Sequence, residues 1–173
     1  MSFQYAGKEF AQPRPLHTLV LVDVRNSAPQ DDDAQPAIAH CRSALRHARS
    51  VGLPVCFLHE ARSAPARSWM SGMQPTRDDR LFVRRGPSCF DNPYFAEAAS
   101  GILVLAGFFG RDTIMATARD ARRHARSLIL LEDAIARPSG FVRLGQALPD
   151  SAKAGIRSCP TQSWIDATEQ GEV

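Results

Sequence analysis

Four residues of the sequence could carry out chemistry on a small molecule, and all of them stand at the end of an apolar run. They are Asp23, Arg84, Gly110 and Thr113. A carboxylate beside a buried run is costly to bury without a partner, and burial raises its pKa, which suits a general acid or base. An arginine can hold an anionic group, and the backbone N–H groups of a turn that opens a helix can bind an oxyanion.

Each of these positions also has a structural interpretation. Asp23 could cap a turn together with Asn26, and Asp112 or Thr113 could cap the helix that follows the glycine turn. The two cations after the third apolar run could form a solvated rim, which is the interpretation that we favour for Arg85. For Asp23 the position at the end of a predicted strand favours a functional role.

Four aromatic residues lie near the same segments. Phe90, Phe108 and Phe109 could line an apolar pocket, and Trp69 could close it from the long loop 60–79. The same side chains could equally belong to the core. A loop of that length inside a compact domain is usually functional or mobile.

The elements that must position these residues can be predicted from periodicity. Strands are expected at 18–24, 55–58, 81–83, 102–106 and 128–131, and helices at 37–50, 111–126 and near 161–169. The acidic run 31–33 is expected to cap and complement the N-terminus of the first helix. Strands that alternate with helices predict an α/β fold with a mostly parallel sheet covered on both faces, and ligands of such folds bind beyond the carboxyl ends of the strands.

Length and composition limit the class of protein. The 173 residues predict one domain over 1–173, with an extended lead-in at 1–17. With 44% hydrophobic and 23% charged residues, no long apolar run and no secretory pattern, we expect a folded protein without a membrane partner. A net charge of +3 gives little support for nucleic acid as a partner. Four cysteines without a CxxC pair are interpreted as reduced thiols of a cytoplasmic protein.

Four segments, in this order, resemble the isochorismatase-like cysteine hydrolase superfamily, which includes nicotinamidases, carbamoylsarcosine amidases and isochorismatases. They are TLVLVDVRNS at 18–27, VRRGPSCFDN at 83–92, VLAGFFGRDTIMATARDA at 104–121 and LILLEDAIA at 128–136. The resemblance implies a three-layer α/β/α sandwich with a mostly parallel, Rossmann-like central sheet. It also implies homo-oligomers and a small-molecule substrate.

The departures from the family pattern determine which chemistry is expected. Asp23 stands at the catalytic aspartate, but Arg84 stands at the catalytic lysine and Thr113 at the nucleophilic cysteine. If the alignment slips by one residue, Arg85 takes the lysine position; Arg25 stands where the family usually has glutamine. A threonine hydroxyl needs a general base, and an arginine does not shuttle protons. We therefore do not expect the thioester route of the amidases.

Isochorismatases of this family also lack the cysteine, and the resemblance implies an aspartate acid and water in place of a covalent intermediate. Asp23 would protonate the substrate while Arg84 holds its carboxylate. Cys89 is interpreted as a packed residue and not as a relocated nucleophile. A lone His59 is interpreted as structural, so no metal and no cofactor are expected.

The expected function is hydrolysis of a small, anionic molecule by a non-cysteine mechanism. Its expected catalytic residues are Asp23, Arg84 and Thr113, and its expected substrate-binding residues are Asn26, Trp69, Phe90, Phe108, Phe109 and Gly110. The alternative is an inactive family member that serves as a ligand-binding or oligomeric scaffold protein. An active enzyme should show Asp23 desolvated in a pocket with Arg84 facing it. In an inactive relic, Arg84 should turn to solvent, or the aromatic residues should fill the pocket.

Overall fold

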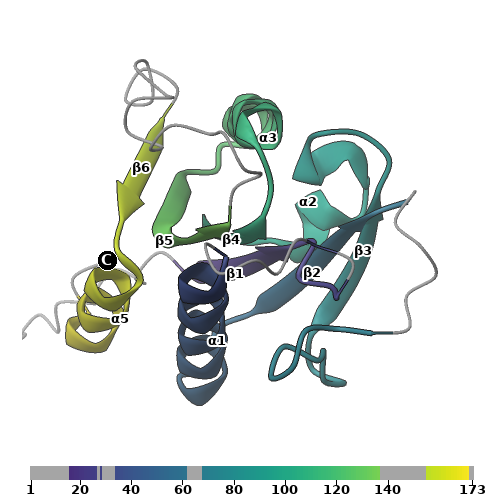
Figure 1. Cartoon of the computed structure of the whole chain (residues 1–173). Helices are drawn as coiled ribbons and strands as arrows, with labels where there is room; N and C mark the ends of the chain where they lie inside the picture. The colour runs from purple at the N-terminus through teal and green to yellow at the C-terminus, as the bar shows by residue number, and fades with distance from the viewer. Residues whose placement is uncertain (1–15, 27, 29–33, 62–67, 137–154, 172–173) are drawn as a thin grey trace, which may run out of the picture.

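A computed structural model describes residues 16–26, 28, 34–61, 68–136 and 155–171 (Figure 1). Its strands are β1 His17–Val22, β2 Val55–Glu60, β3 Arg80–Arg84, β4 Ile102–Phe108, β5 Leu128–Ala136 and β6 Ile156–Cys159. Its helices are α1 Gln35–Ser50, α2 Phe95–Ala98, α3 Arg111–Arg123 and α5 Thr161–Gln170, with a short 3-10 turn at Cys89–Asp91. None of the helices in the described ranges is long and apolar enough to cross a membrane.

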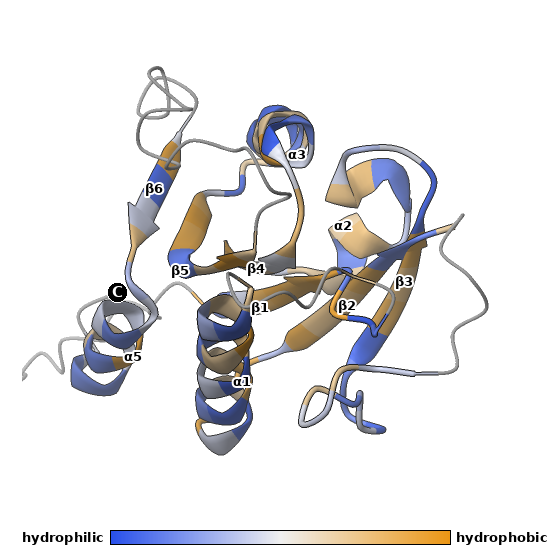
Figure 2. Ribbon diagram, viewed as in Figure 1, coloured by the Kyte–Doolittle hydropathy of each residue, from blue (hydrophilic) through white to orange (hydrophobic). Residues whose placement is uncertain are grey.

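The six strands form one sheet in the order β3-β2-β1-β4-β5-β6, and all neighbouring pairs are parallel. Helices α1 and α5 cover one face, while α2 and α3 cover the other (Figure 1). Figure 2 shows the apolar strands between helices whose outer faces are polar. Strand β1 lies near the middle of the sheet and is buried along its whole length, as its continuous apolar run predicts. The expected three-layer α/β fold is confirmed.

The predicted strands and helices all occur, but their ends differ. Strand β5 continues through the polar pair Glu132 and Asp133 to Ala136, because its last residues still pair with β4 after a register shift. Strand β6, helix α2 and the 3-10 turn were not predicted, because each is too short to show a periodicity. The predicted lead-in falls outside the described residues except for its last two, and its final residue, His17, already belongs to β1.

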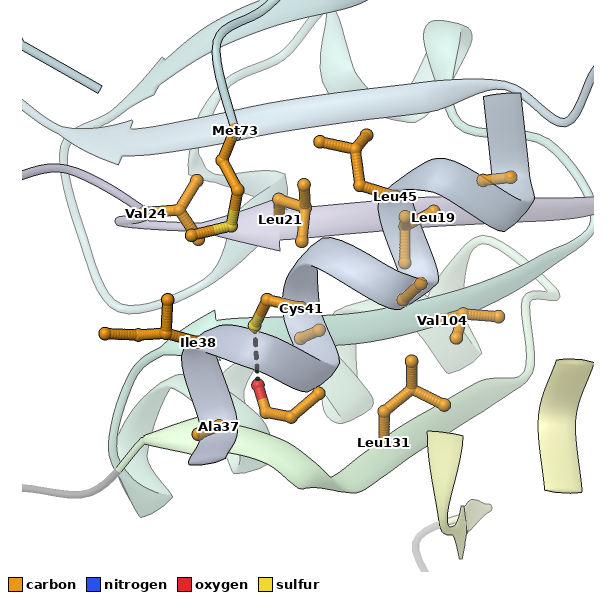
Figure 3. Packing of buried hydrophobic residues seen from close by; sticks show 14 of the residues in the cluster. Leu19, Leu21, Val24, Ala37, Ile38, Cys41, Leu45, Met73, Val104 and Leu131 are labelled. Carbon is orange, nitrogen blue, oxygen red and sulfur yellow. Dashed lines mark hydrogen bonds between the residues drawn. The ribbon is translucent and has the colours of Figure 1, made fainter. Parts of the chain in front are cut away.

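Helix α1 packs the apolar stripe that its sequence predicts onto the sheet (Figure 3). Ile38, Cys41 and Leu45 are spaced by three and four residues and all are buried. The Cys41 thiol donates to the Ala134 carbonyl oxygen at 3.0 Å, so the helix is also tied to β5 by a hydrogen bond (Figure 3). The helix begins after Ala34, and the acidic run expected to cap it lies outside the described residues.

Helix α5 is held to the sheet by a buried indole and, at its first residue, by hydrogen bonds from Thr161 to the Asp133 carboxylate. Trp164 is 1% exposed, and its Nε1–H donates to Nδ1 of His17 at 2.9 Å. The edge of the same indole meets the ring of His47 at a centroid distance of 5.4 Å. Burial, followed by the charge of Arg157, lowers the pKa of His17. The neutral imidazole that this favours is the form that can accept the indole hydrogen bond.

Candidate active site

The three segments singled out in the sequence meet at the carboxyl edge of the sheet. Asp23 follows β1, Arg84 is the last residue of β3, and α3 begins two residues after the end of β4. Parallel strands place all their carboxyl ends at one edge, which is where ligands of α/β folds bind. Chain topology therefore brings together residues that are far apart in the sequence.

Asp23 and Arg84 form an ion pair at this edge. Nη2 of Arg84 donates to Oδ2 of Asp23 at 2.6 Å, and the backbone N–H of Glu60 donates to Oδ1 at 3.0 Å. The Arg84 side chain is 7% exposed and that of Asp23 is 22% exposed. Asp23 has a φ of +54°, a left-handed conformation that aspartate tolerates better than most residues. The carboxylate is thus fixed by both of its oxygens and remains in reach of solvent.

Arg84 is held on its other side as well. Its Nη1 donates to the carbonyl oxygens of Gly86 at 2.9 Å and Pro87 at 3.3 Å. Its Nε is buried and has no hydrogen-bond partner in the described part of the chain. The neighbouring Arg85 is exposed, so Arg84 is the cation that faces Asp23. These contacts leave Arg84 little capacity to hold a substrate anion, although the sequence suggested that role.

The turn between β4 and α3 approaches β1 very closely. Gly107 pairs with Val22 and has a φ of +124°, and a Cβ at this position would lie 2.2 Å from the Val22 carbonyl oxygen. Gly110 is the N-cap of α3, and no side chain caps this helix. The first N–H groups of a helix have no intrahelical acceptor, so those of the first turn, around the buried Thr113, are available to a ligand.

The predicted aromatic residues do not gather at one place. Phe90 stacks on His124 with a centroid distance of 4.8 Å and meets the edge of Phe95 at 5.2 Å. Phe109 is 7% exposed and packs in the same cluster, on the α3 face of the sheet. Phe108 packs on the opposite face, against the cluster beneath α1. The contacts of Phe90 and Phe109 fit the core alternative that the sequence left open.

Trp69 instead forms a pair with Arg25, which the sequence had marked only as a departure from the family pattern. Arg25 is 5% exposed, and its Cζ lies 4.6 Å from the centroid of the Trp69 ring. The two residues also form an isolated antiparallel β-bridge. Nε and Nη2 of Arg25 are buried and have no hydrogen-bond partner within the described residues. Burial lowers the pKa of Arg25, and the charge of Asp23 opposes this shift.

Two further predicted residues lie close to this pair. Asn26 is exposed, and its backbone N–H donates to the Ser68 carbonyl oxygen at 3.2 Å. His59 meets the Trp69 ring edge-on at 6.3 Å, and its Nδ1 is buried without a hydrogen-bond partner among the residues described. Burial and then the charge of Arg25 lower the pKa of His59. Within the described ranges, no group of three or more His, Cys, Asp or Glu residues is placed to hold a metal ion.

Burial disfavours the thiolate form of all four cysteines. All four are free, and burial raises their pKa values: to about 12 for Cys41 and Cys56, to about 11 for Cys89, and upward for Cys159. Cys89 is fully buried, and its backbone N–H donates to Oγ1 of Thr117 at 3.0 Å. Thiols in this state are protonated and weakly nucleophilic at neutral pH.

Comparison with solved structures finds several chains with a similar fold. A putative isochorismatase from Burkholderia xenovorans LB400 is 19% identical with a TM-score of 0.74, covering 92% of this chain and 90% of its own. A cysteine hydrolase from Pseudomonas syringae pv. phaseolicola is 16% identical with a TM-score of 0.74, covering 92% and 99%. An N-carbamoylsarcosine amidase from Thermoplasma acidophilum is 18% identical with a TM-score of 0.68, covering 84% and 96%.

Comparison with curated protein sequences finds no match. A family profile, that of the isochorismatase domain, matches residues 17–143. This range includes the Asp23–Arg84 pair, the glycine turn and the first helix turn of α3. The protein therefore belongs to the isochorismatase family.

Proposed function

We propose that this member of a hydrolase family cleaves a small molecule at the carboxyl edge of its sheet, with Asp23 as acid/base and without a cysteine nucleophile. The observation that carries the proposal is the Asp23–Arg84 ion pair, in which Arg84 is buried and Asp23 is mostly buried. Arg84 faces Asp23, as expected of an active enzyme, and does not turn to solvent, which is one of the two arrangements expected of a relic. The raised pKa values of all four thiols support a route that uses no thiolate.

The Asp23 carboxylate is held in place by Arg84 and by the Glu60 backbone N–H, and in the amide reaction it acts first as the proton acceptor. For an amide substrate, Asp23 takes a proton from water as the water oxygen attacks the carbonyl carbon. The resulting oxyanion is stabilised by backbone N–H groups of the first turn of α3 and by the hydroxyl of Thr113. The proton then passes from Asp23 to the leaving nitrogen as the C–N bond breaks.

For a vinyl ether substrate the same carboxyl group works in the opposite order. Protonated Asp23 donates to the double-bond carbon, and a water molecule adds to the cationic carbon that results. The carboxylate recovers a proton from this water, so its protonation state is restored before the hemiketal collapses. Arg84 positions Asp23 in both cases and takes no part in proton transfer, because a guanidinium group does not shuttle protons.

A hydrolysis screen of the purified protein tests the proposal. The panel contains isochorismate, nicotinamide, small amides and carbamoyl compounds, and it is repeated with Asp23→Asn and with Cys89→Ala. We expect turnover of at least one compound, a loss of about 10²–10⁴-fold in Asp23→Asn and none in Cys89→Ala. No turnover by folded wild-type protein would support the inactive alternative, a ligand-binding or oligomeric scaffold. The homo-oligomer and the cytoplasmic location stay predictions. Light scattering, which measures the molar mass in solution, tests the first of them.

A further inference from the structure

The charges at the candidate active site do not balance. Arg84 and Arg25 are both buried cations, and Asp23 is the only carboxylate paired with either of them in the described residues. Both Asp23 oxygens are already occupied, one by Arg84 and one by the backbone N–H of Glu60. One buried guanidinium, that of Arg25, therefore has no ion-pair partner among the residues that the structure describes.

A buried guanidinium without an ion-pair partner destabilises the folded protein unless a bound group supplies the missing charge. A buried charge needs a counter-charge and acceptors for its N–H groups, and the Trp69 ring beneath Arg25 supplies neither an acceptor in the guanidinium plane nor a negative charge. The cation–π contact offsets part of the cost and fixes the guanidinium on the ring. The edge of the guanidinium, which carries the N–H donors, stays unpaired at Nε and Nη2. A bound anion would supply both the counter-charge and the hydrogen-bond acceptors that Nε and Nη2 lack among the described residues.

The location of Arg25 indicates what that anion is. Arg25 lies two residues after Asp23, its backbone N–H donates to the Asp23 carbonyl oxygen at 2.8 Å, and its guanidinium is near enough to feel the charge of the Asp23 carboxylate. His59, also edge-on to Trp69, adds a buried Nδ1 without a described partner. Planar guanidinium groups match the two oxygens of a carboxylate.

We propose that Arg25, supported by Trp69, binds a carboxylate of the substrate, so that the enzyme acts on small carboxylates whose scissile bond lies toward Asp23. This rests on the proposed function in taking the Asp23 edge as the binding site. It gives Arg25 the anion-holding role that the sequence assigned to Arg84, which is occupied by Asp23, Gly86 and Pro87.

Titration calorimetry with matched probes tests this assignment. The probes are formate, acetate and benzoate, and each is compared with its uncharged amide. Wild-type protein should bind at least one carboxylate more tightly than the corresponding amide. Arg25→Gln should weaken the binding of that carboxylate about ten- to a hundred-fold and change the affinity for the amide by no more than about two-fold. Arg85→Gln is the control: it removes an exposed cation from the same edge and should change neither the carboxylate affinity nor the amide affinity.

Two further variants separate recognition from folding. A structural role for Arg25 would weaken carboxylate and amide equally, which would overturn the proposal. If Arg25→Gln does not fold, Arg25→Lys keeps the charge without the planar fork and should still weaken the carboxylate several-fold relative to the amide. Equal carboxylate affinity in the folded Arg25 variant, or no carboxylate preference in wild-type protein, also overturns it. Because binding needs no turnover, failure of the hydrolysis screen would overturn the proposed function separately.

Discussion

The Asp23 carboxylate and the Arg84 guanidinium, 61 positions apart in the sequence, meet at 2.6 Å across the end of β2. β1 supplies the candidate acid/base and β3 supplies its counter-ion, so the pair exists only when the sheet is assembled. Each partner compensates the charge of the other, with Arg84 buried and Asp23 partly exposed. The same contact therefore contributes to stability and to the proposed chemistry.

Removing one partner should destabilise the protein. Asp23→Asn leaves the buried Arg84 uncompensated, and we expect a loss of about 2 kcal/mol in the free energy of unfolding, with the 22% exposure of Asp23 keeping the loss below that of a fully buried pair. The double variant Asp23→Asn/Arg84→Met should recover most of this loss. Urea unfolding measures all three proteins. Asp78→Asn, at a side chain that is 86% exposed, is the control.

An equal loss in the single and double variants would contradict this account, because it would mean that the loss does not come from the uncompensated cation. The measurement also guides the hydrolysis screen. Activity of Asp23→Asn is meaningful only where the variant is folded, and the urea curve gives the conditions under which it is.

The sequence predicted the fold well because the strands of a parallel sheet are apolar on both faces. Strand β1 is entirely buried, and its continuous apolar run could not be mistaken for a surface element. Strand β6 was missed because it has no such continuous buried run. Only Ile156 of its four residues is buried, because β6 forms the edge of the sheet and pairs on one side only. Its 4 residues are too few and too exposed to show the pattern from which a strand is predicted, whereas the other edge strand, β3, was found from the apolar run 81–83.

The candidate site was predicted in part. Strand ends can be located from apolar runs, and this was enough to find Asp23 and Arg84. Which atoms Arg84 contacts depends on the conformation of the chain after β3, where it donates to Gly86, and no periodicity carries that information. The pairing of Arg25 with Trp69 joins two loop segments, so the sequence showed an unusual residue at position 25 but not its role.

Gly107 should not tolerate a side chain. Gly107→Ala would place a Cβ 2.2 Å from the Val22 carbonyl oxygen at a φ of +124°, and we expect a loss of about 3 kcal/mol or more in stability. Gly110→Ser is the matched control. A Cβ on Gly110 meets no atom within 4 Å, and serine is a good N-cap residue, so stability should be unchanged or higher by about 0.5 kcal/mol. Similar melting temperatures for the two variants would contradict the close approach of β4 and β1.

Thiol reagents should not inhibit the protein. Cys89, the cysteine closest in sequence to Arg84, is fully buried, and its thiol has a pKa of about 11. Iodoacetamide at neutral pH should therefore leave any hydrolytic activity within about two-fold of the untreated rate. Mass spectrometry shows which cysteines react, and modification of the half-buried Cys159 without loss of activity is compatible with this expectation. Rapid inactivation that follows alkylation of Cys89 would contradict this prediction and support a mechanism with Cys89 as the covalent nucleophile.

Stability should fall as the pH drops below about 6.5. His17 has an ordinary pKa of 6.5 in the unfolded chain, and its folded-state pKa is lower because of burial and the charge of Arg157. Between these two values the unfolded chain binds the extra proton, so the free energy of unfolding decreases with decreasing pH and is fully recovered above 6.5. His59 shifts in the same direction and adds to the effect.

Substitution of His17 by a residue that does not titrate tests this dependence. His17→Asn can still accept the Trp164 indole hydrogen bond through its amide oxygen, but it takes up no proton. Melting temperatures measured between about pH 7.5 and about pH 5 should fall less steeply for this variant than for the wild type, with a remaining slope from His59. Because Trp164 anchors α5, acid should also expose its indole, and tryptophan fluorescence should shift to the red before the sheet unfolds. An identical pH dependence in both proteins would show that His17 does not couple protonation to the docking of α5.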